Sequence, residues 1–206
     1  IFKAGDVRGV VGQEWGADEA RRIGRSLGRM IRTRGDASVC VGGDFRRSTP
    51  LLKQEFVAGL LEAGLAVYDV GQQPTPLVYF AARQLGCRSV AVVTASHNPA
   101  RYNGVKFVVA GQPAVPQLVE ELEAGCQTPP QAAARGTLSC HELTAAYEDW
   151  LIRRAGEFVG PAPSASGPPL SVVLDAMAGA CTHIAPRVLA RAGVTVTALT
   201  PAIDPE

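Results

Sequence analysis

Short apolar runs alternate with longer amphipathic stretches along the first part of this chain, and no other feature restricts its fold as strongly. The Val-rich runs that are short enough to be buried strands are residues 39–41, 65–70, 89–93 and 105–109. The stretches with helical spacing or helix-start signals are residues 17–34, 48–64, 76–85 and 116–124. Strands that alternate with helices in this way predict an α/β fold, with a mostly parallel mixed sheet sandwiched by helices.

The composition changes after residue 125, which indicates a second structural region. Residues 127–136 predict a loop, 142–154 a helix, and 160–169, rich in Pro, Ser, Ala and Gly, a flexible connection. A second α/β unit is then predicted from a strand at 170–174, a helix at 182–192 and a strand at 194–199. We therefore expect a complete first domain at 1–139 and the incomplete beginning of a similar second domain at 140–206.

Composition excludes several classes of function. A net charge of +1 provides no field that would attract nucleic acid or an anionic membrane, so neither is expected as a partner. The sequence contains no apolar run as long as a membrane span and no secretory signal, and it begins with Ile1, which suggests a piece of a longer chain. The five cysteines are odd in number and lack Cys-x-x-Cys spacing, which fits a reducing cytoplasm and argues against disulfides or zinc. Cys40 and Cys87 are expected in the core.

The segment Thr94–Asn103, called the serine loop below, follows the predicted strand at 89–93 and carries the strongest chemical signal. Ligands of open α/β sheets bind beyond the carboxyl ends of the strands, where Ser96 is expected to lie. A serine there can act as a nucleophile, and Lys106, on the strand that returns from the loop, can pair with a phosphate. The ordinary alternatives are a serine that caps a turn and a lysine that is solvated.

Four segments, in the same order, resemble the α-D-phosphohexomutase family. They are the opening Phe2–Gly12, Gly42-Gly43-Asp44-Phe45-Arg46, Gly71-Gln72-Gln73-Pro74-Thr75-Pro76, and the serine loop with Gly104-Val105-Lys106. The opening is most similar to the phosphomannomutase/phosphoglucomutase branch, although Gly5 stands where the family prefers an aromatic residue. The resemblance covers the whole chain and favours the chemical interpretation of Ser96 and Lys106 over the ordinary ones.

The resemblance implies an intramolecular phosphotransferase that interconverts hexose 1-phosphate and hexose 6-phosphate. Ser96 would carry the phosphoryl group, Lys106 and His97 would stabilise charge, and Arg8 would position the substrate or move a proton. Arg8, Asn98 and Lys106 would contact the hexose phosphate. Asp44 and Arg46 predict either an ion pair behind the serine loop or a structural turn.

The resemblance also implies a Mg²⁺ cofactor and glucose or mannose 1,6-bisphosphate as intermediate. Ser96 would contribute to the metal site through its phosphoryl oxygen. The family's Asp-Gly-Asp metal loop, its sugar-recognition loop and its C-terminal phosphate-binding loop have no counterpart among the 206 residues. We therefore expect the isolated chain to be inactive. The preferred sugar and the oligomeric state stay open.

Three alternatives remain. A phosphoglucosamine mutase would carry the same loop, and so would a non-catalytic protein that binds sugar phosphates. A serine hydrolase is less favoured because no Gly-x-Ser-x-Gly turn surrounds Ser96. Neighbouring loop residues also rarely face each other, which argues against a Ser96–His97 dyad.

Overall fold

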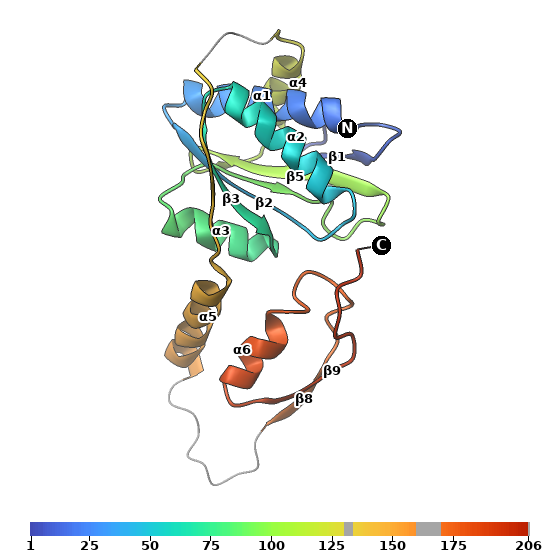
Figure 1. Ribbon diagram of the computed structural model, residues 1–206, viewed down its shortest axis with the longest axis vertical. Coiled ribbons are helices and arrows are strands. Elements are labelled where there is room, and N and C mark those ends of the chain that lie inside the picture. Colours follow the sequence, from blue (N-terminus) through green and yellow to red (C-terminus); the bar gives the residue numbers. More distant parts are fainter. Residues whose placement is uncertain (130–133, 160–169, 206) are drawn as a thin grey trace. The chain divides into compact units, whose positions relative to one another are not determined.

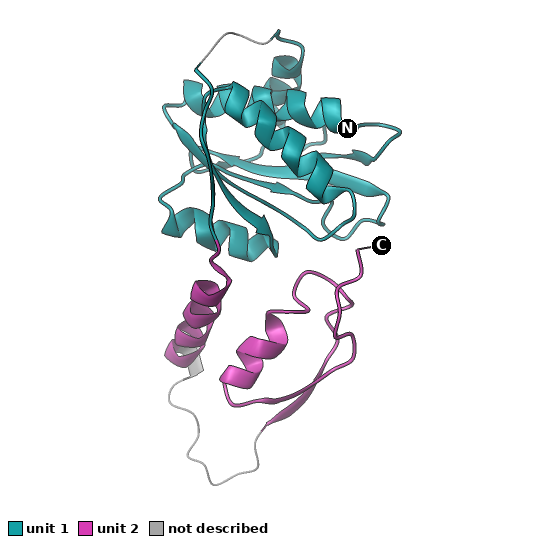
Figure 2. Ribbon diagram, viewed as in Figure 1, with its two compact units in different colours: residues 1–141, 206 teal, residues 142–205 magenta. Residues whose placement is uncertain are grey.

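The computed structural model describes residues 1–129, 134–159 and 170–205. These residues form two compact units, Ile1–His141 and Glu142–Pro205 (Figure 2). The domain boundary predicted from the sequence, between residues 139 and 140, falls inside the last strand of the first unit. Each unit is described separately below.

A mixed sheet forms the centre of the first unit. Its strands are β1 (Val7–Val10), β2 (Ser38–Gly43), β3 (Ala66–Gln72), β4 (Val90–Val93), β5 (Tyr102–Val109), β6 (Gln112–Pro113) and β7 (Leu138–Cys140). The order across the sheet is β1-β5-β4-β2-β3-β7, and β6 pairs with β5. The four strands from β4 to β7 are parallel, whereas β5 is antiparallel to both β4 and β1. The predicted mostly parallel mixed sheet is confirmed.

Helices cover both faces of this sheet (Figure 1). They are α1 (Ala17–Thr33), α2 (Thr49–Glu62), α3 (Thr75–Gln84) and α4 (Pro116–Cys126). Two adjacent glycines of β2 show that α2 and α3 lie on opposite faces, because successive strand residues point in opposite directions. A Cβ atom on Gly42 would meet Val78 of α3, and one on Gly43 would meet Thr49 of α2. The largest buried cluster fills the face beneath α1, α2 and α4.

Helix α1 forms where its sequence pattern predicts. The Glu19 carboxylate accepts a hydrogen bond of 2.9 Å from the Gly16 amide, which satisfies one of the amides left free at a helix start. Ile23, Leu27 and Ile31 recur at helical spacing, and all three are at most 1% exposed. Hydrophobic periodicity and a local cap therefore suffice to place this helix.

The strands β1, β6 and β7 were not predicted, and β5 begins earlier than expected. The sequence Val-Arg-Gly-Val of β1 has little strand character, and the strand exists because it pairs with Tyr102–Val105. Asn103-Gly104, a dipeptide typical of turns, lies inside β5 and is hydrogen-bonded between β1 and β4. Long-range pairing therefore overrides the local turn signal here.

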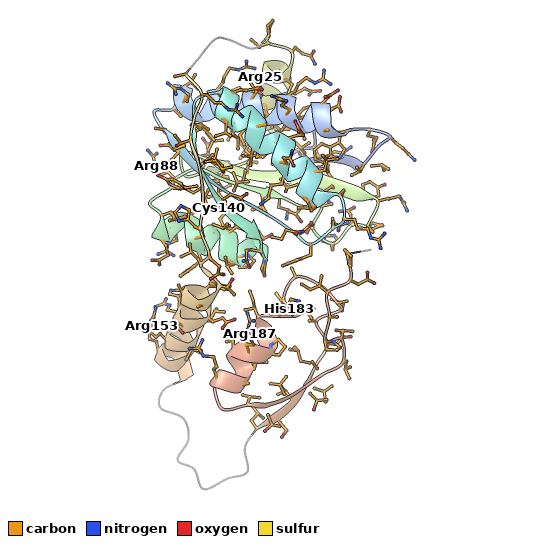
Figure 3. The ribbon with its side chains drawn as sticks, viewed as in Figure 1. Arg25, Arg88, Cys140, Arg153, His183 and Arg187 are labelled. Atoms are coloured by element: carbon orange, nitrogen blue, oxygen red, sulfur yellow. The ribbon has the colours of Figure 1, made fainter. Side chains whose placement is uncertain are left out.

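In the second unit, which is smaller, the residues that the structure describes form two helices and a two-stranded sheet. Its elements are α5 (Thr144–Val159), β8 (Ser171–Leu174), α6 (Ala185–Arg191) and β9 (Thr195–Ala198), and the two strands are parallel. Arg187 of α6, labelled in Figure 3, donates a hydrogen bond of 2.8 Å to Glu148 of α5. The predicted helix at 182–192 begins only at Ala185, because Thr182 closes a turn by donating to the Gly179 carbonyl.

Two predicted connections extend beyond what the structure describes. The predicted connection at 160–169 lies entirely outside the described residues, and so do residues 130–133 of the predicted loop. Every helix among the described residues is too short or too polar to cross a lipid bilayer.

Candidate functional site

Ser96 lies just beyond the carboxyl end of β4, and its side chain is exposed. Its backbone φ of 59° is in the left-handed region, which L residues other than glycine rarely adopt. Such a conformation costs on the order of 1–2 kcal/mol and is maintained only where surrounding contacts fix it. The structure thus presents the Ser96 hydroxyl to solvent from a strained position, as expected for a side chain that meets a ligand.

The Oγ of Ser96 lies 3.2 Å from Nδ1 of His97, so the two side chains form a direct contact. Ser96 and His97 thus face each other, contrary to the expectation that neighbouring loop residues rarely do. His97 is exposed and can therefore also reach a ligand bound at Ser96.

Arg8 and Lys106 share one face of the sheet. Arg8 lies opposite Gly104 in the antiparallel pair of β1 and β5, and Lys106 follows Gly104 by two residues on β5. Residues opposite each other, and residues two apart on one strand, point to the same face. Lys106 is also paired with Val92, close to the point where β4 leads into the serine loop. The register thus places the two cations on one face of the sheet, with Lys106 on the strand beside β4, which leads into the serine loop.

The two cations differ in their partners. The guanidinium of Arg8 forms an ion pair with Asp6, and its Nε is buried without a hydrogen-bond partner among the described residues. The half-buried Lys106 forms no ion pair or hydrogen bond within the part of the chain that the structure describes. Lys106 is therefore the cation that is free to meet an anion.

Asn98 is half-buried and its amide is engaged within the loop. Its Nδ2 donates a hydrogen bond of 2.9 Å to the carbonyl of Ala95. This bond closes the loop on itself and positions the residues around Ser96. A contact between Asn98 and a substrate stays a prediction.

The carboxyl ends of β2 and β3 meet the serine loop at the same edge of the sheet. The Asp44 amide donates to the Val93 carbonyl at 2.9 Å, and Gln72 Nε2 donates to the Asp44 carbonyl at 2.9 Å. Asp44 and Arg46 form the ion pair behind the loop that was one of the two predicted alternatives, at 3.0 Å. All four segments that carry the family resemblance therefore contribute to this edge.

Sequence reasoning missed the buried polar residues Thr49, Thr94 and Asn103, which are at most 5% exposed. Thr49 and Thr94 donate hydrogen bonds to Asp44, and Asn103 donates one to Thr49. The sequence signal that could have pointed to Asn103 is the Asn103-Gly104 dipeptide, which lies inside a run of strand-forming residues. A buried polar side chain has to find hydrogen-bond partners, and these partners come from distant segments. Sequence alone does not reveal which segments those are.

Among the described residues, no group of three or more His, Cys, Asp or Glu side chains gathers closely enough to hold a metal ion. A magnesium ion prefers about six oxygen ligands, several of which are commonly carboxylates, phosphates or waters. The residues near Ser96 therefore do not fit a complete metal site on their own.

Comparison with known proteins agrees with this geometry. Residues 1–133 match the family model described as phosphoglucomutase/phosphomannomutase, alpha/beta/alpha domain I. The chain is 36% identical over 204 residues to a phosphomannomutase/phosphoglucomutase from Pseudomonas putida, which covers 99% of this chain and 42% of that protein. It is 39% identical over 157 residues to a phosphomannomutase from Salmonella typhimurium, which covers 73% of this chain and 34% of that protein.

A solved structure supports the same assignment. The phosphoglucomutase/phosphomannomutase family protein from Burkholderia thailandensis superposes with a TM-score of 0.88 at 33% identity, over 100% of this chain and 44% of that one. The chain thus spans less than half the length of these relatives. Because the family model matches well over half of the chain and the fold agrees throughout, the chain belongs to the phosphoglucomutase/phosphomannomutase family.

Proposed function

We propose that this chain is the phosphoryl-donor portion of an intramolecular phosphotransferase that interconverts the 1-phosphate and 6-phosphate of glucose or mannose. The observation that carries the proposal is the exposed Ser96 hydroxyl just beyond the carboxyl end of β4, in a left-handed conformation, with Lys106 on the neighbouring strand β5 and Arg8 on the same face of the sheet as Lys106. Family membership supports the reaction class, and the exposed position of Ser96 supports its role as the phosphoryl donor.

In the proposed reaction, phosphorylated Ser96 transfers its phosphoryl group to a free hydroxyl of a hexose monophosphate. A bond forms between that hydroxyl oxygen and phosphorus, the bond from phosphorus to Ser96 Oγ breaks, and a hexose bisphosphate results. The hydroxyl loses its proton and the departing Oγ gains one, and His97 Nδ1 lies at 3.2 Å from that Oγ. The bisphosphate then returns its other phosphoryl group to Ser96, so the sugar leaves with its phosphate at the other position.

The cations act on the charge that accumulates between two phosphates. The ammonium of Lys106 lowers the repulsion between the Ser96 phosphate and the substrate phosphate. The forked guanidinium of Arg8, which is ion-paired with Asp6, would bind phosphate or sugar oxygens or assist the movement of a proton. The proposed substrate contacts are therefore Arg8, Asn98 and Lys106.

Mg²⁺ and glucose or mannose 1,6-bisphosphate belong to the proposal as cofactor and intermediate. The described residues do not form a metal site by themselves, so Ser96 would supply only its phosphoryl oxygen, and no step above passes through the metal. The further ligands would come from parts of the longer protein that this chain does not contain. For the same reason residues 1–206 alone should show no turnover. The cytoplasm is the proposed location.

The test is a single-turnover experiment on the natural full-length protein and its Ser96→Ala variant. Mass spectrometry first measures phosphate on the peptide that carries Ser96. The phosphoprotein is then mixed with one equivalent of glucose 1-phosphate or mannose 1-phosphate and Mg²⁺, and ³¹P NMR follows the serine phosphate and the bisphosphate. The expected result is conversion of the hexose 1-phosphate to the 6-phosphate, with a bisphosphate signal that rises as the serine phosphate falls and declines as the serine phosphate returns, and none of this in Ser96→Ala.

Other outcomes identify the alternatives. Preference for glucosamine 6-phosphate would indicate a phosphoglucosamine mutase. Binding of hexose phosphate in a calorimeter, without any transfer, would indicate a non-catalytic binding protein. Covalent labelling of Ser96 by a fluorophosphonate would indicate a serine hydrolase, the class that the Ser96–His97 contact brings back into consideration.

A further inference from the structure

Arg46 spans the serine loop from behind and contacts it at four points. Its Nη1 donates to the carbonyls of Pro99 at 2.8 Å and Tyr102 at 3.2 Å. Its Nη2 donates to the carbonyls of Ser96 at 3.1 Å and Asn98 at 2.6 Å. One guanidinium therefore gathers carbonyls from both ends of the loop.

The fifth donor of Arg46 is fixed by Asp44. Arg46 Nε donates to Asp44 Oδ2 at 3.0 Å, and the side chains of Arg46 and Asp44 are only 13% and 16% exposed. A guanidinium has five N–H donors, and the hydrogen bonds of Arg46 correspond to all five. Arg46 is thus saturated by protein groups, which argues against a role as a phosphate ligand.

Asp44 also fixes the backbone amide of Ser96, through Thr94. Its Oδ2 accepts a hydrogen bond of 2.7 Å from Thr94 Oγ1, and Thr94 Oγ1 in turn accepts the Ser96 amide at 2.9 Å. The Ser96 amide is thus tied to Asp44 through Thr94, while the Ser96 carbonyl is tied to Arg46. Both peptide groups of the left-handed residue are held by the same ion pair.

We infer that Arg46 is a positioning residue that keeps Ser96 in its left-handed conformation and so fixes the direction of Oγ for phosphoryl transfer. The inference rests on the proposed function. A conformation that is intrinsically unfavourable relaxes when its contacts are removed. Without Arg46, four loop carbonyls lose their shared donor, and the Ser96 Oγ no longer has one fixed position.

This role predicts an effect on the transfer step rather than on substrate capture. Arg46 has no donor left for substrate, whereas Lys106 and Arg8 lie on the sheet face that substrate would approach. A misplacement of about 1 Å at a reacting atom can reduce the rate by about 100-fold. Loss of Arg46 should therefore lower kcat by about 100-fold and leave KM within about threefold of the wild-type value.

The experiment compares Arg46→Ala, Arg46→Lys and the control Arg22→Ala in the natural full-length protein. Arg22 lies on α1 with a 49% exposed side chain and an ion pair to Glu19, so the control loses the same charge and one ion pair away from the loop. Hydrogen exchange of the Ser96 to Tyr102 amides and of the β2 and β4 amides is measured beside kcat and KM. Lysine has three donors and no planar fork, so Arg46→Lys should recover only part of kcat.

The expected result is a selective fall in kcat for Arg46→Ala, with exchange at the Ser96 amide at least tenfold faster and exchange in β2 and β4 unchanged. Wild-type kcat in Arg46→Ala would overturn the inference, and so would a rise in KM at constant kcat. If Arg46→Ala does not fold, Arg46→Lys is judged by the same criteria. If the wild-type protein transfers no phosphate, the proposed function fails, and an unchanged Ser96 exchange rate in the variants would still overturn the positioning role.

Discussion

Asn103 Nδ2 donates a hydrogen bond of 2.9 Å to Thr49 Oγ1, although the two residues are 54 positions apart in the chain. Both are 0% exposed, and the bond links β5 to the first turn of α2. Thr49 Oγ1 in turn donates a hydrogen bond of 2.6 Å to Asp44 Oδ1. A continuous set of hydrogen bonds thus joins Asn103, the last residue of the serine loop, to the ion pair between Asp44 and Arg46.

We expect Asn103→Ala to lower the free energy of unfolding by about 2–3 kcal/mol, because it leaves buried polar groups without partners. The lost bonds include those to Thr49 and to the Gly104 amide. Urea unfolding followed by circular dichroism measures the change. Asn98→Ala, in the half-buried loop, is the control and should cost less than about 1 kcal/mol. Equal losses in the two variants would show that the buried network contributes no extra stability.

The close approach of α1 and α2 depends on Gly24. A Cβ atom there would lie 2.0 Å from the carbonyl oxygen of Phe56, a backbone atom of α2 that cannot move independently. We expect Gly24→Ala to destabilise the first unit by about 3 kcal/mol or more. Gly156→Ala is the matched control, because no atom of the described residues, apart from its own helix backbone and chain neighbours, lies within 4 Å of the Cβ position of that glycine in α5. The control should be neutral or stabilise by up to about 1 kcal/mol in thermal unfolding.

At acid pH, protonation of Glu62 in α2 should weaken its ion pairs with Arg21 and Arg25 of α1. Partial burial tends to raise its pKa, but hydrogen bonds from Arg21 and Arg25 outweigh burial and hold the pKa below its ordinary value of 4.5. A carboxyl with a lowered folded-state pKa stabilises the protein above its unfolded-state value, and this contribution is lost as pH falls through the folded-state value. Glu62→Gln should therefore flatten the loss of stability below about pH 4.5.

The size of this acid effect should be modest. The ion pair is partly exposed, and pairs of this kind contribute at most about 1 kcal/mol. Chemical unfolding at a series of pH values from 3 to 7 measures it, with the exposed carboxyl of α4 in Glu120→Gln as control. The same pH profile for Glu62→Gln and the wild type would contradict this assignment.

The cysteines should differ sharply in reactivity. Cys140 and Cys181 are exposed, whereas Cys40 is fully buried, and burial raises the pKa of Cys40 to about 12. The thiolate is the reactive form, so Cys40 should resist alkylation at pH 8 until the protein unfolds. Iodoacetamide labelling with peptide mass spectrometry, with and without urea, tests this. Rapid labelling of Cys40 in the folded protein would mean that β2 opens locally.

Lys106 is the residue whose removal should most directly impair charge stabilisation. Lys106→Met keeps most of the side-chain length but removes the ammonium, and we expect kcat of the natural full-length protein to fall by about 100-fold. Lys3→Met, at an exposed position, removes the same charge and should leave kcat unchanged. Steady-state kinetics with glucose 1-phosphate separate the two. A Lys106→Met variant with wild-type kcat would remove Lys106 from the proposed mechanism.

Prediction from sequence succeeded where a signal is local and repeated. The buried strands β2 and β4 are short Val-rich runs, β3 falls on a predicted apolar run, and α1 carries its own cap and apolar stripe. Prediction failed for β1 and β7, whose sequences carry little strand signal and which become strands only through pairing with β5 and β3. The strand predicted at 105–109 also begins earlier, at Tyr102, because the turn preference of Asn103-Gly104 is weaker than the two flanking ladders of hydrogen bonds.

The amino-acid sequence by itself determined the α/β class, the positions of most elements and the identity of the serine loop, because each depends on residues close together in the chain. Only the tertiary structure decided that Ser96 adopts a left-handed conformation facing His97, and that Arg46 and Asp44 hold the peptide groups on both of its sides. These contacts join segments about 50 residues apart. Their geometry is fixed by the parallel register of β2 and β4, and that register arises from the packing of the whole sheet.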